Sequence, residues 1–492
     1  MNSGTARESG KLVSVSNPYV GPRAFRPGER LPNREREARE LADLVIAERV
    51  VLLHSPSGAG KTSLIQSAVI RMLADDGFRS FGPARVDKPP PGEVNVRNRY
   101  VNSLALYLLG DRRTDPHQFE SCTLEEVLSD ATAATPQIEP QEVPVLMVDQ
   151  FEEILTLDPT DWHQKEEFFE ELGAVLAKGE LWALLAIRED YMGGLERYRK
   201  LLPGHLRARY RLDFLTHDEA KLAIQQPAED RDVQFRDAAA QALIDQLAKT
   251  KVSSPDQTCE WQEAPYVEPF QLQVVCHTLW GSVSSAKHDH FHAIELDDVE
   301  KVDINHALSR FYGDSVADAA ERTKVPERTI RDWFENQLVT PQKFRGQTAA
   351  RPVLGEEGAQ ALRLLEDAHL IRVDTRAQTT WYELEHDRLI TAVLNNNELW
   401  RWANLEPWQR AAHEWQRNGR PRELLLAPHD IPRFGPHITE QLTVEERAFR
   451  KASLEEARRE GLMAGARSAV SLLSVIALVE AVVIVILLVL WI

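Results

Sequence analysis

The chain has 492 residues, which is enough for several domains of roughly 100–200 residues each. Acidic residues outnumber basic residues by 76 to 58, and the formal net charge of −18 disfavours a general nucleic-acid binder. Cys122, Cys259 and Cys276 lie far apart without CxxC spacing, so the sequence indicates neither a disulfide framework nor a zinc module. A reducing compartment is therefore expected.

The first half of the chain alternates strand patterns with helix patterns. Residues 1–16 are polar and are predicted to be flexible. Val50–His54 is a short apolar run with β-branched residues, and Lys61–Leu73 has the apolar spacing of a helix. Such alternation is typical of a parallel sheet covered by helices on both faces. The further elements predicted here are strands at Val143–Val148 and Leu181–Ile187 and a helix at Asp161–Leu176.

After Asp213 the pattern becomes helical. Thr216 and Glu219 have the spacing of a capping box, which marks the start of a helix, and helical segments are predicted to about Ser285. Residues 300–395 are predicted to form shorter helices and a pair of strands, and residues 398–465 are helical and charged. The strands are expected at Leu370–Asp374 and Thr380–Leu384, and a second capping box at Thr443–Glu446.

The C-terminal stretch 469–492 is apolar apart from Glu480. As a helix it would be about 36 Å long, enough to cross a hydrocarbon core of about 30 Å, so we predict one transmembrane helix. Arg458, Arg459 and Arg467 precede it, and the positive-inside tendency then leaves the N-terminal bulk in the cytoplasm. The polar N-terminus lacks the apolar core of a secretory signal. The sequence thus predicts a single-pass membrane protein, such as one of the bacterial inner membrane.

Glu480 would lie near the middle of that membrane helix. A lone carboxylate is costly there, and it would be protonated, paired with a neighbouring helix or turned towards a wet cavity. We therefore expect several copies of the chain to assemble around this position.

A glycine-rich loop follows the first predicted strand. Residues 55–62, SPSGAGKT, fit the pattern GxxxxGK[ST] except that Ser55 replaces the first glycine. Glycines let backbone N–H groups converge on phosphate oxygens, and the loop leads into a helix N-terminus that favours negative charge. Lys61 would reach the β- and γ-phosphates, and the Thr62 hydroxyl would bind Mg²⁺. The predicted phosphate-binding residues are Ser57, Gly58, Ala59, Gly60, Lys61, Thr62 and Ser63.

A carboxylate follows the second predicted strand. Asp149 is expected at the end of a strand neighbouring the first one, where it would hold Mg²⁺ through water and complete a metal site with Thr62. Glu152 and Glu153 come next, and either could polarise the attacking water. The loop and this strand together predict a P-loop NTPase, with ATP and GTP not distinguished by these residues.

These motifs resemble those of the novel STAND NTPases, signal-transduction ATPases related to the switch ATPases of the apoptosome and of plant immune receptors. Besides the loop, the resemblance rests on NPYVG at Asn17–Gly21, RERE at Arg34–Glu37 and VDQFEE at Val148–Glu153. It extends from about Asn17 through the predicted membrane helix. It implies an ATPase switch whose ligands are ATP or ADP and Mg²⁺.

The resemblance assigns three further residues. Arg188, which follows the third predicted strand, would sense the γ-phosphate; the other reading is an ordinary arginine paired with Glu189 or Asp190. Pro269 would open a lid helix near the nucleotide base. His386, in the winged-helix region, would touch the β-phosphate of ADP and hold the resting state.

Two positions depart from the family pattern. Gln150 stands where many related ATPases have a second acidic residue, so the catalytic carboxylate is left open between Glu152 and Glu153, and slow hydrolysis is expected. Asn33 replaces the usual glycine before Arg34, which weakens the case for a base contact there.

The resemblance also implies an order of domains and a mode of action. ATP would favour an open, homo-oligomeric state that signals at the membrane in a defence or stress response, and a separate sensor or effector protein could take part. The predicted domains are a flexible N-terminus (1–16), a P-loop NTPase domain (17–215), a helical lid (216–290), a winged-helix domain (291–397), a helical juxtamembrane region (398–468) and the transmembrane helix (469–492).

Two other functions are weighed against this switch. One is a non-hydrolysing scaffold of the membrane that a bound nucleotide stabilises. The other is a membrane-linked transcription regulator, because Val325–Phe334 resembles the entry to a helix-turn-helix with Arg328 and Arg331 on its second helix. Acidic residues intersperse with these arginines and the chain is acidic overall, so no nucleic-acid partner is expected.

Overall fold

The computed structural model describes residues 16–460 and Leu478, with gaps at 91–94, 111–119, 134–141, 159, 254–258, 288–290, 302–303, 341–342, 350, 354, 377–378, 387 and 432–441. The chain divides into two compact units, Met1–Leu394 and Asn395–Ile492. The predicted flexible segment at the N-terminus lies almost wholly outside the described residues, because only position 16 of it is described.

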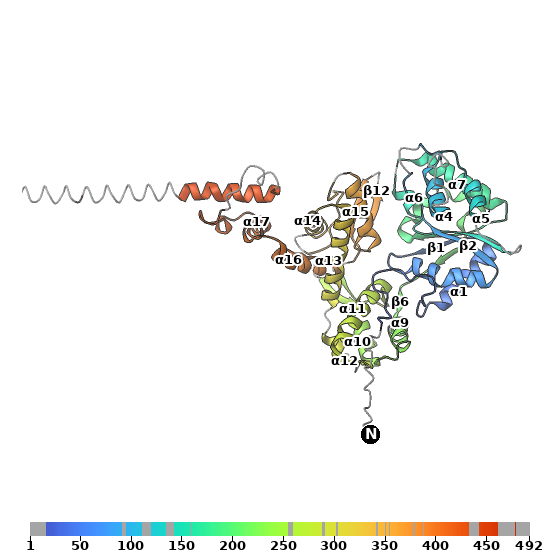
Figure 1. Cartoon of the computed structure of the whole chain (residues 1–492), viewed down its shortest axis with the longest axis horizontal. Coiled ribbons are helices and arrows are strands. Elements are labelled where there is room, and N and C mark those ends of the chain that lie inside the picture. Colours follow the sequence, from blue (N-terminus) through green and yellow to red (C-terminus); the bar gives the residue numbers. More distant parts are fainter. Residues whose placement is uncertain are drawn as a thin grey trace, which may run out of the picture. The chain divides into compact units, whose positions relative to one another are not determined.

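A five-stranded parallel sheet forms the centre of the N-terminal part of the first unit (Figure 1). The predicted strands at 50–54, 143–148 and 181–187 are confirmed, and two edge strands were missed. The spatial order is β2-β3-β4-β1-β5, and every neighbouring pair is parallel. The strands are β1 (Val50–Ser55), β2 (Phe78–Ala84), β3 (Val143–Val148), β4 (Trp182–Arg188) and β5 (Arg209–Arg211).

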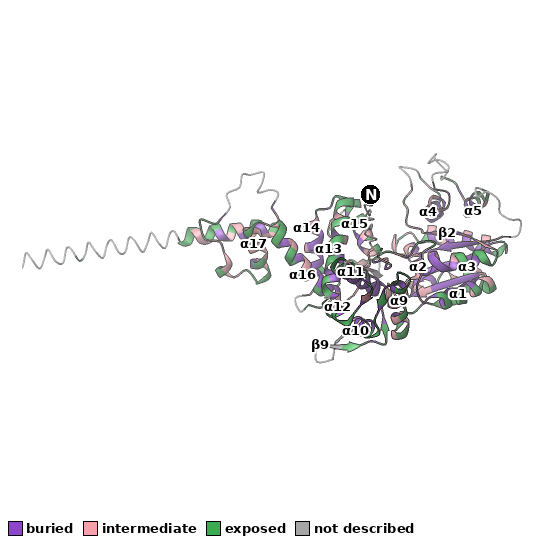
Figure 2. Cartoon of the chain, turned by 60° about the horizontal axis from the view of Figure 1, so that its bottom comes forward, coloured by how far each residue is buried: buried purple, intermediate pink, exposed green. Residues whose placement is uncertain are grey.

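Helices cover both faces of this sheet, as predicted (Figure 2). Side chains alternate along each strand, so Leu146 and Val148 of β3 enter one apolar layer, whereas Val145 and Met147 enter the other. The first layer also contains residues of α4, α5 and α7, and the second contains residues of α1, α2 and α3. The helices of this region are α1 (Glu35–Glu48), α2 (Lys61–Leu64), α3 (Ile70–Asp75), α4 (Arg99–Leu108), α5 (Leu124–Ala133), α6 (Glu153–Thr156), α7 (Trp162–Ala177) and α8 (Met192–Leu195).

The next region is helical with one clear exception. The capping box at Thr216 starts a helix, as predicted. The Thr216 hydroxyl accepts from the backbone N–H of Glu219, and the Glu219 carboxylate accepts from the backbone N–H of Thr216. Residues 249–263, predicted to be helical, instead contain an antiparallel strand pair, for which the alternating residues of KTKVS and CEWQE are better suited. The elements are β6 (Leu215–Thr216), α9 (His217–Glu229), β7 (Gln234–Phe235), α10 (Asp237–Leu247), β8 (Lys249–Ser253), β9 (Cys259–Glu263), β10 (Tyr266–Val267), α11 (Pro269–Lys287), β11 (Ala293–Ile294) and α12 (Leu296–Lys301).

Three helices and a hairpin complete the first unit. They are α13 (Ile304–Thr323), α14 (Glu327–Gln337), α15 (Glu356–Asp367), β12 (Ile371–Arg376) and β13 (Thr379–Leu384). The strand pair predicted at 370–384 is confirmed and is antiparallel. One continuous apolar cluster joins these helices to α9, α10 and α11.

The segment Asn17–Tyr19 attaches the N-terminal part of the chain to the apolar cluster of α9, α10 and α11. Tyr19 is buried, and its hydroxyl donates to the carbonyl oxygen of Ile224 at 2.5 Å. Asn17 donates through Nδ2 to the carbonyl oxygen of His277 at 2.9 Å. The segment that leads into α1 is therefore held against α9 and α11.

The second unit begins within α16 (Arg388–Asn404) and has a small core of its own. Ala412 and Trp415 of α17 (Pro407–Arg417) pack with Phe449 of a helix over residues 444–460. That helix starts at the predicted capping box, in which Thr443 and Glu446 bond to each other's backbone N–H.

No helix within the described residues is both long enough and apolar enough to cross a bilayer. The span predicted at 469–492, with Glu480, lies outside the described residues except for Leu478. The transmembrane helix therefore stays a prediction.

Gly173 allows α7 to approach a neighbouring segment closely. A Cβ at this position would lie 1.9 Å from the carbonyl oxygen of Leu201, so backbone would have to move. We expect Gly173→Ala to lower the free energy of unfolding by about 1–3 kcal/mol, because overpacking outweighs the roughly 1 kcal/mol helix preference of alanine. Urea unfolding followed by tryptophan fluorescence measures this.

Gly281→Ala in α11 is the matched control, since a Cβ there meets no atom within 4 Å. That variant should be neutral or more stable by up to about 1 kcal/mol. Equal stability of Gly173→Ala and the parent chain would contradict the steric argument.

Candidate active site

The glycine-rich loop joins β1 to α2 with two residues in the left-handed region. Gly58 has φ +74° and Gly60 has φ +96°, a conformation that side chains other than glycine adopt at a cost. Lys61 is the first residue of α2, so its side chain and the free N–H groups of the first helical turn start from one place. The loop therefore has the backbone geometry that phosphate binding requires.

Ser55, which replaces the usual glycine, has its own role in this loop. Its hydroxyl donates to the carbonyl oxygen of Pro56 at 2.7 Å and accepts from Lys61 Nζ at 2.9 Å. Burial lowers the pKa of Lys61, while Glu152 and Asp149 nearby raise it. The ammonium group thus lies in a poorly solvated place, where an anionic ligand would stabilise its charge.

Thr62 and Asp149 form a direct pair. The Thr62 hydroxyl donates to Asp149 Oδ2 at 2.6 Å. The expectation that β3 adjoins β1 is wrong, because β4 lies between them and both carboxyl ends point to the same edge. A hydroxyl and a carboxylate are oxygen ligands of the kind that Mg²⁺ takes together with phosphate oxygens, so these residues fit the metal.

Glu152 and Glu153, left open by the sequence, lie in different surroundings. Glu152 lines the cavity, and its Oε2 accepts from the backbone N–H of Arg188 at 3.2 Å. Glu153 is not among the lining residues, and its carboxylate lies 3.8 Å from Arg85 Nη1. Burial raises the pKa of both carboxyl groups.

Arg188 is the last residue of β4 and is almost fully buried. Its Nη1 lies 3.7 Å from Glu366 Oε1 and its Nη2 lies 3.3 Å from Asp190 Oδ2. Its Nε is buried without a hydrogen-bond partner among the described residues. The guanidinium therefore has donor capacity left for a ligand.

One cavity of about 530 Å³ contains most of the predicted site. This volume is within the range of ligand pockets. The structure thus brings together residues that lie far apart in the sequence. The predicted residues that line it are Ser57, Gly58, Ala59, Gly60, Lys61, Thr62, Ser63, Asp149, Glu152, Arg188 and Pro269.

His386 lies apart from the other predicted site residues. It is not among the residues that line the cavity, and its Nδ1 lies 3.0 Å from Glu268 Oε2. Burial alone would lower the pKa of His386, but the Glu268 carboxylate raises it. The pair ties the segment after β13 to the residue before α11, and contact of this histidine with a phosphate stays a prediction.

Several cavity residues had no signal in the sequence. Glu366 and Asp367 end α15, and His369 follows two residues later, far along the chain from the loop. Phe270 follows the predicted Pro269. Burial lowers the pKa of His369 to about 4, so the ring is neutral at neutral pH. Its centroid lies 4.9 Å from that of Phe270, which gives the cavity an aromatic wall suited to a flat ring.

The two departures from the family pattern both have left-handed backbone. Asn33 has φ +54°, and Gln150 has φ +50°. Asparagine tolerates this region better than most residues, which explains how it replaces glycine. Gln150 lines the cavity and donates through Nε2 to Asp367 Oδ1 at 3.4 Å.

The parallel sheet, the glycine-rich loop and the Thr62–Asp149 pair define a P-loop NTPase. The family model described as Novel STAND NTPase 1 matches residues 18–423. The chain belongs to that family, as its motifs indicated.

Comparison with known proteins adds little beyond the family. No curated protein matches. Among solved structures, a Walker-type ATPase, PABY2304 of Pyrococcus abyssi, is 13% identical with a TM-score of 0.41, and the match covers 76% of this chain and 98% of that one. The ORC2 protein of Aeropyrum pernix in its ADPNP–ADP complexes is 17% identical with a TM-score of 0.39, over 77% and 97% of the two chains. Likeness at this level carries no statement about what this chain binds.

Proposed function

We propose that this chain is a switch that binds ATP with Mg²⁺ and hydrolyses it slowly to ADP and phosphate. The observation that supports this most is the single cavity that gathers Lys61, Thr62, Asp149, Glu152 and Arg188. Lys61 and Arg188 would neutralise phosphate charge, and Thr62 and Asp149 would hold the metal ion. That ion would draw charge from the phosphate oxygens.

Glu152 is proposed as the group that orients and polarises the attacking water. It faces the cavity, and the backbone N–H of Arg188 fixes its carboxylate. Glu153 has no access to the cavity in this structure and is proposed to act only on packing and on Arg85. Proton acceptance by a fixed carboxylate contributes typically 10²–10⁴-fold to a rate.

The switch itself is proposed to act through the winged-helix region. The end of α15 forms part of the cavity wall, so the bound nucleotide touches the region that would move. A nucleotide shifts such an equilibrium only as far as its affinity differs between the two arrangements. ADP would favour the arrangement seen here, and Mg·ATP would favour an open one that oligomerises.

The site of action is proposed to be a membrane, through the apolar stretch 469–492 with the bulk of the chain in the cytoplasm. Assembly around Glu480 would couple the nucleotide state to the membrane, either as a signal or as a change in the bilayer. A separate sensor or effector protein would supply the trigger. A role in defence or stress is the corresponding proposal at the level of the family.

A DNA-binding role has less support than the switch. The second helix of the helix-turn-helix pattern is α14, where Arg331 is buried and lies 2.8 Å from Glu327. Arg328 lies 3.6 Å from Asp332. These arginines are engaged within the helix, whereas a recognition helix needs basic side chains directed at phosphates and bases.

Size analysis of the full chain in detergent tests the switch. We expect one size with ADP and a larger assembly with ATPγS and Mg²⁺, measured by light scattering after gel filtration. A size that is the same with both nucleotides would contradict the switch. Nucleotide binding without phosphate release in a single turnover would instead favour the non-hydrolysing scaffold.

A further inference from the structure

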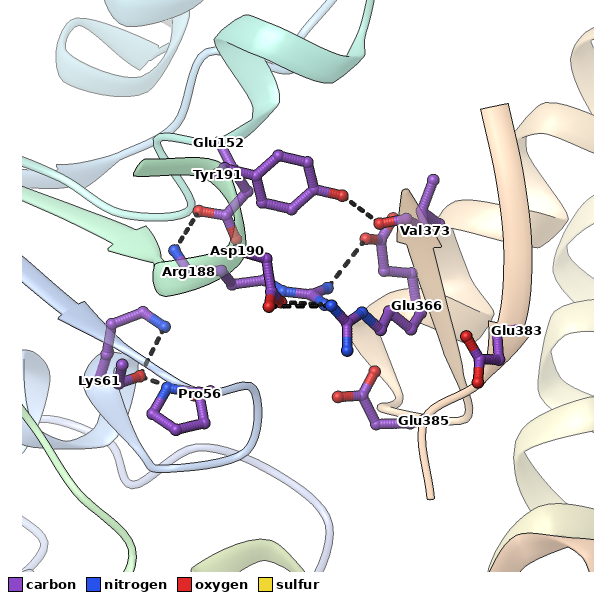
Figure 3. A network of polar contacts seen from close by, with 12 residues as sticks. Pro56, Lys61, Glu152, Arg188, Asp190, Tyr191, Glu366, Val373, Glu383 and Glu385 are labelled. Atoms are coloured by element: carbon purple, nitrogen blue, oxygen red, sulfur yellow. Dashed lines mark hydrogen bonds and ion pairs between the residues drawn. The ribbon is translucent and has the colours of Figure 1, made fainter. Parts of the chain in front are cut away.

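The end of α15 lies against the carboxyl ends of β2, β3 and β4 and makes three polar contacts there. Glu366 Oε1 lies 3.7 Å from Arg188 Nη1 (Figure 3). The next residue, Asp367, lies 3.2 Å from Arg85 Nη1 and accepts from Gln150 Nε2 at 3.4 Å. Two adjacent carboxylates of one helix end therefore contact residues on the far side of the nucleotide cavity.

The hairpin β12–β13, which follows α15, also contacts the residues at the end of β4. Arg372 Nη2 lies 2.9 Å from Asp190 Oδ1, and the Tyr191 hydroxyl donates to the carbonyl oxygen of Val373. Asp190 and Tyr191 follow closely after Arg188 in the chain. The arrangement of α15 and β12 against β4 is called here the closed arrangement. It is held by the contact of Glu366 with Arg188 and by the contacts of β12 with Asp190 and Tyr191.

We infer that Glu366 is a specificity-determining residue: by holding Arg188 in the closed arrangement, it makes that arrangement accept a nucleoside diphosphate and reject a triphosphate. The inference rests on the proposed function. In the proposed function Arg188 meets the third phosphate group, since it ends the strand between β1 and β3 and lines the cavity. Glu366, whose Oε1 lies 3.7 Å from Arg188 Nη1, and that phosphate group would compete for the positive charge of the same guanidinium.

The competition matters because the Arg188 side of the contact is buried. The side chain of Arg188 is 8% exposed, whereas that of Glu366 is 35% exposed, so little water replaces a partner that the guanidinium loses. If the guanidinium turned to a phosphate, the Glu366 carboxyl would stay behind without its partner and beside additional negative charge. A diphosphate leaves the Arg188–Glu366 contact undisturbed.

The surroundings of Glu366 make this discrimination depend on pH. Burial raises the pKa of Glu366 to about 8, Arg188 lowers it, and Glu152, Asp367 and Glu385 raise it further. Below pH 8 the carboxyl group is mostly protonated in the closed arrangement and repels a triphosphate little. Above pH 8 it is ionised, so the preference for the diphosphate should grow as the pH rises from 7 to 9.

Glu366→Gln tests the inference at pH 9, where Glu366 of the parent chain is ionised, with the full chain in detergent and Kd measured by calorimetry. At this pH we expect ATPγS to bind about tenfold more tightly than to the parent chain, with ADP changed less than twofold. Glu356→Gln is the matched control, because Glu356 is exposed at the other end of the same helix. That variant should leave both values unchanged, and thermal melting checks that each variant folds.

Two further readouts separate charge competition from a general effect on packing. In an Arg188→Gln background, Glu366→Gln should no longer tighten ATPγS, since the contested donor is gone. The ratio of the two Kd values in the parent chain should rise with pH and should be flat in Glu366→Gln.

The outcomes distinguish this inference from the proposed function. A parent chain that binds neither nucleotide overturns both. A parent chain that binds both, with the same Kd ratio and the same pH profile in Glu366→Gln, overturns the role of Glu366 and leaves the ATPase switch intact. If Glu366→Gln lowers the Kd values of ADP and ATPγS by the same factor, the proposed role of Glu366 is also wrong.

Discussion

Replacing Lys61 with alanine is expected to weaken the binding of both ADP and ATPγS by about 100-fold. The ammonium group is buried beside the loop and donates to Ser55, so it is already directed at the place where phosphates would lie. A hydrogen bond to a charged group contributes about 1.5–3 kcal/mol, and the loss of one such contact accounts for a change of about 100-fold. Calorimetry with the full chain in detergent measures the two Kd values.

Lys178→Ala is the control for this change. Lys178 is exposed on the far end of α7 and lies against Glu125, away from the cavity. This variant should bind both nucleotides as the parent chain does. Unchanged binding by a folded Lys61→Ala variant would show that the loop does not hold phosphate, and the proposed function would then be wrong.

Exchanging each of the two glutamates for glutamine should separate their roles. Glu152→Gln is expected to slow phosphate release in a single turnover by about 10²–10⁴-fold, because the amide cannot accept a proton from water. The amide oxygen can still accept from the N–H of Arg188, so nucleotide affinity should change little. Glu153→Gln should lower the rate less than about threefold, since Glu153 lies outside the cavity.

The pH dependence of hydrolysis gives a second test of Glu152. Burial raises the pKa of this carboxyl above its ordinary value, so the group is protonated and inactive over a wider acidic range. The rate should therefore rise with pH, with its midpoint above 4.5 in the parent chain, and this step should vanish in Glu152→Gln. Equal rates in Glu152→Gln and Glu153→Gln would contradict the assignment.

The binding measurement on Lys61→Ala and the rate measurements on the two glutamate variants both need the full chain. The cavity wall includes Lys61 from the first helix after the loop and Glu366 from α15, so a truncated P-loop domain would lack part of the site. Affinity measured on such a piece would report a different protein. The nucleotide and the winged-helix region are parts of one equilibrium.

Much of the site was predictable because its signals are local. The strand–loop–helix around Lys61 needs glycines at Gly58 and Gly60, and the strand that leads to Asp149 is a short apolar run. Capping boxes at Thr216 and Thr443 likewise depend on residues three positions apart. Such features are decided by backbone geometry within one turn or one strand, so a sequence shows them directly.

The hairpin at 249–263 and the edge strands were missed for an opposite reason. β2 and β5 are stabilised by pairing with β3 and β1, and their own patterns are short or irregular. β8 and β9 pair with each other across residues 254–258. Strand formation depends on such partners more than on intrinsic preference.

The sequence by itself determined the class of this protein: the loop at 55–62 and Asp149 define a P-loop NTPase, and the motifs at 17–21, 34–37 and 148–153 indicate the STAND family. The tertiary structure decided that β4 separates β1 from β3, that Glu152 and not Glu153 faces the cavity, that His386 pairs with Glu268, and that Glu366 reaches Arg188. The physical reason is that the Arg188–Glu366 and Glu268–His386 contacts join residues far apart in the chain, and only tertiary packing brings such side chains into contact.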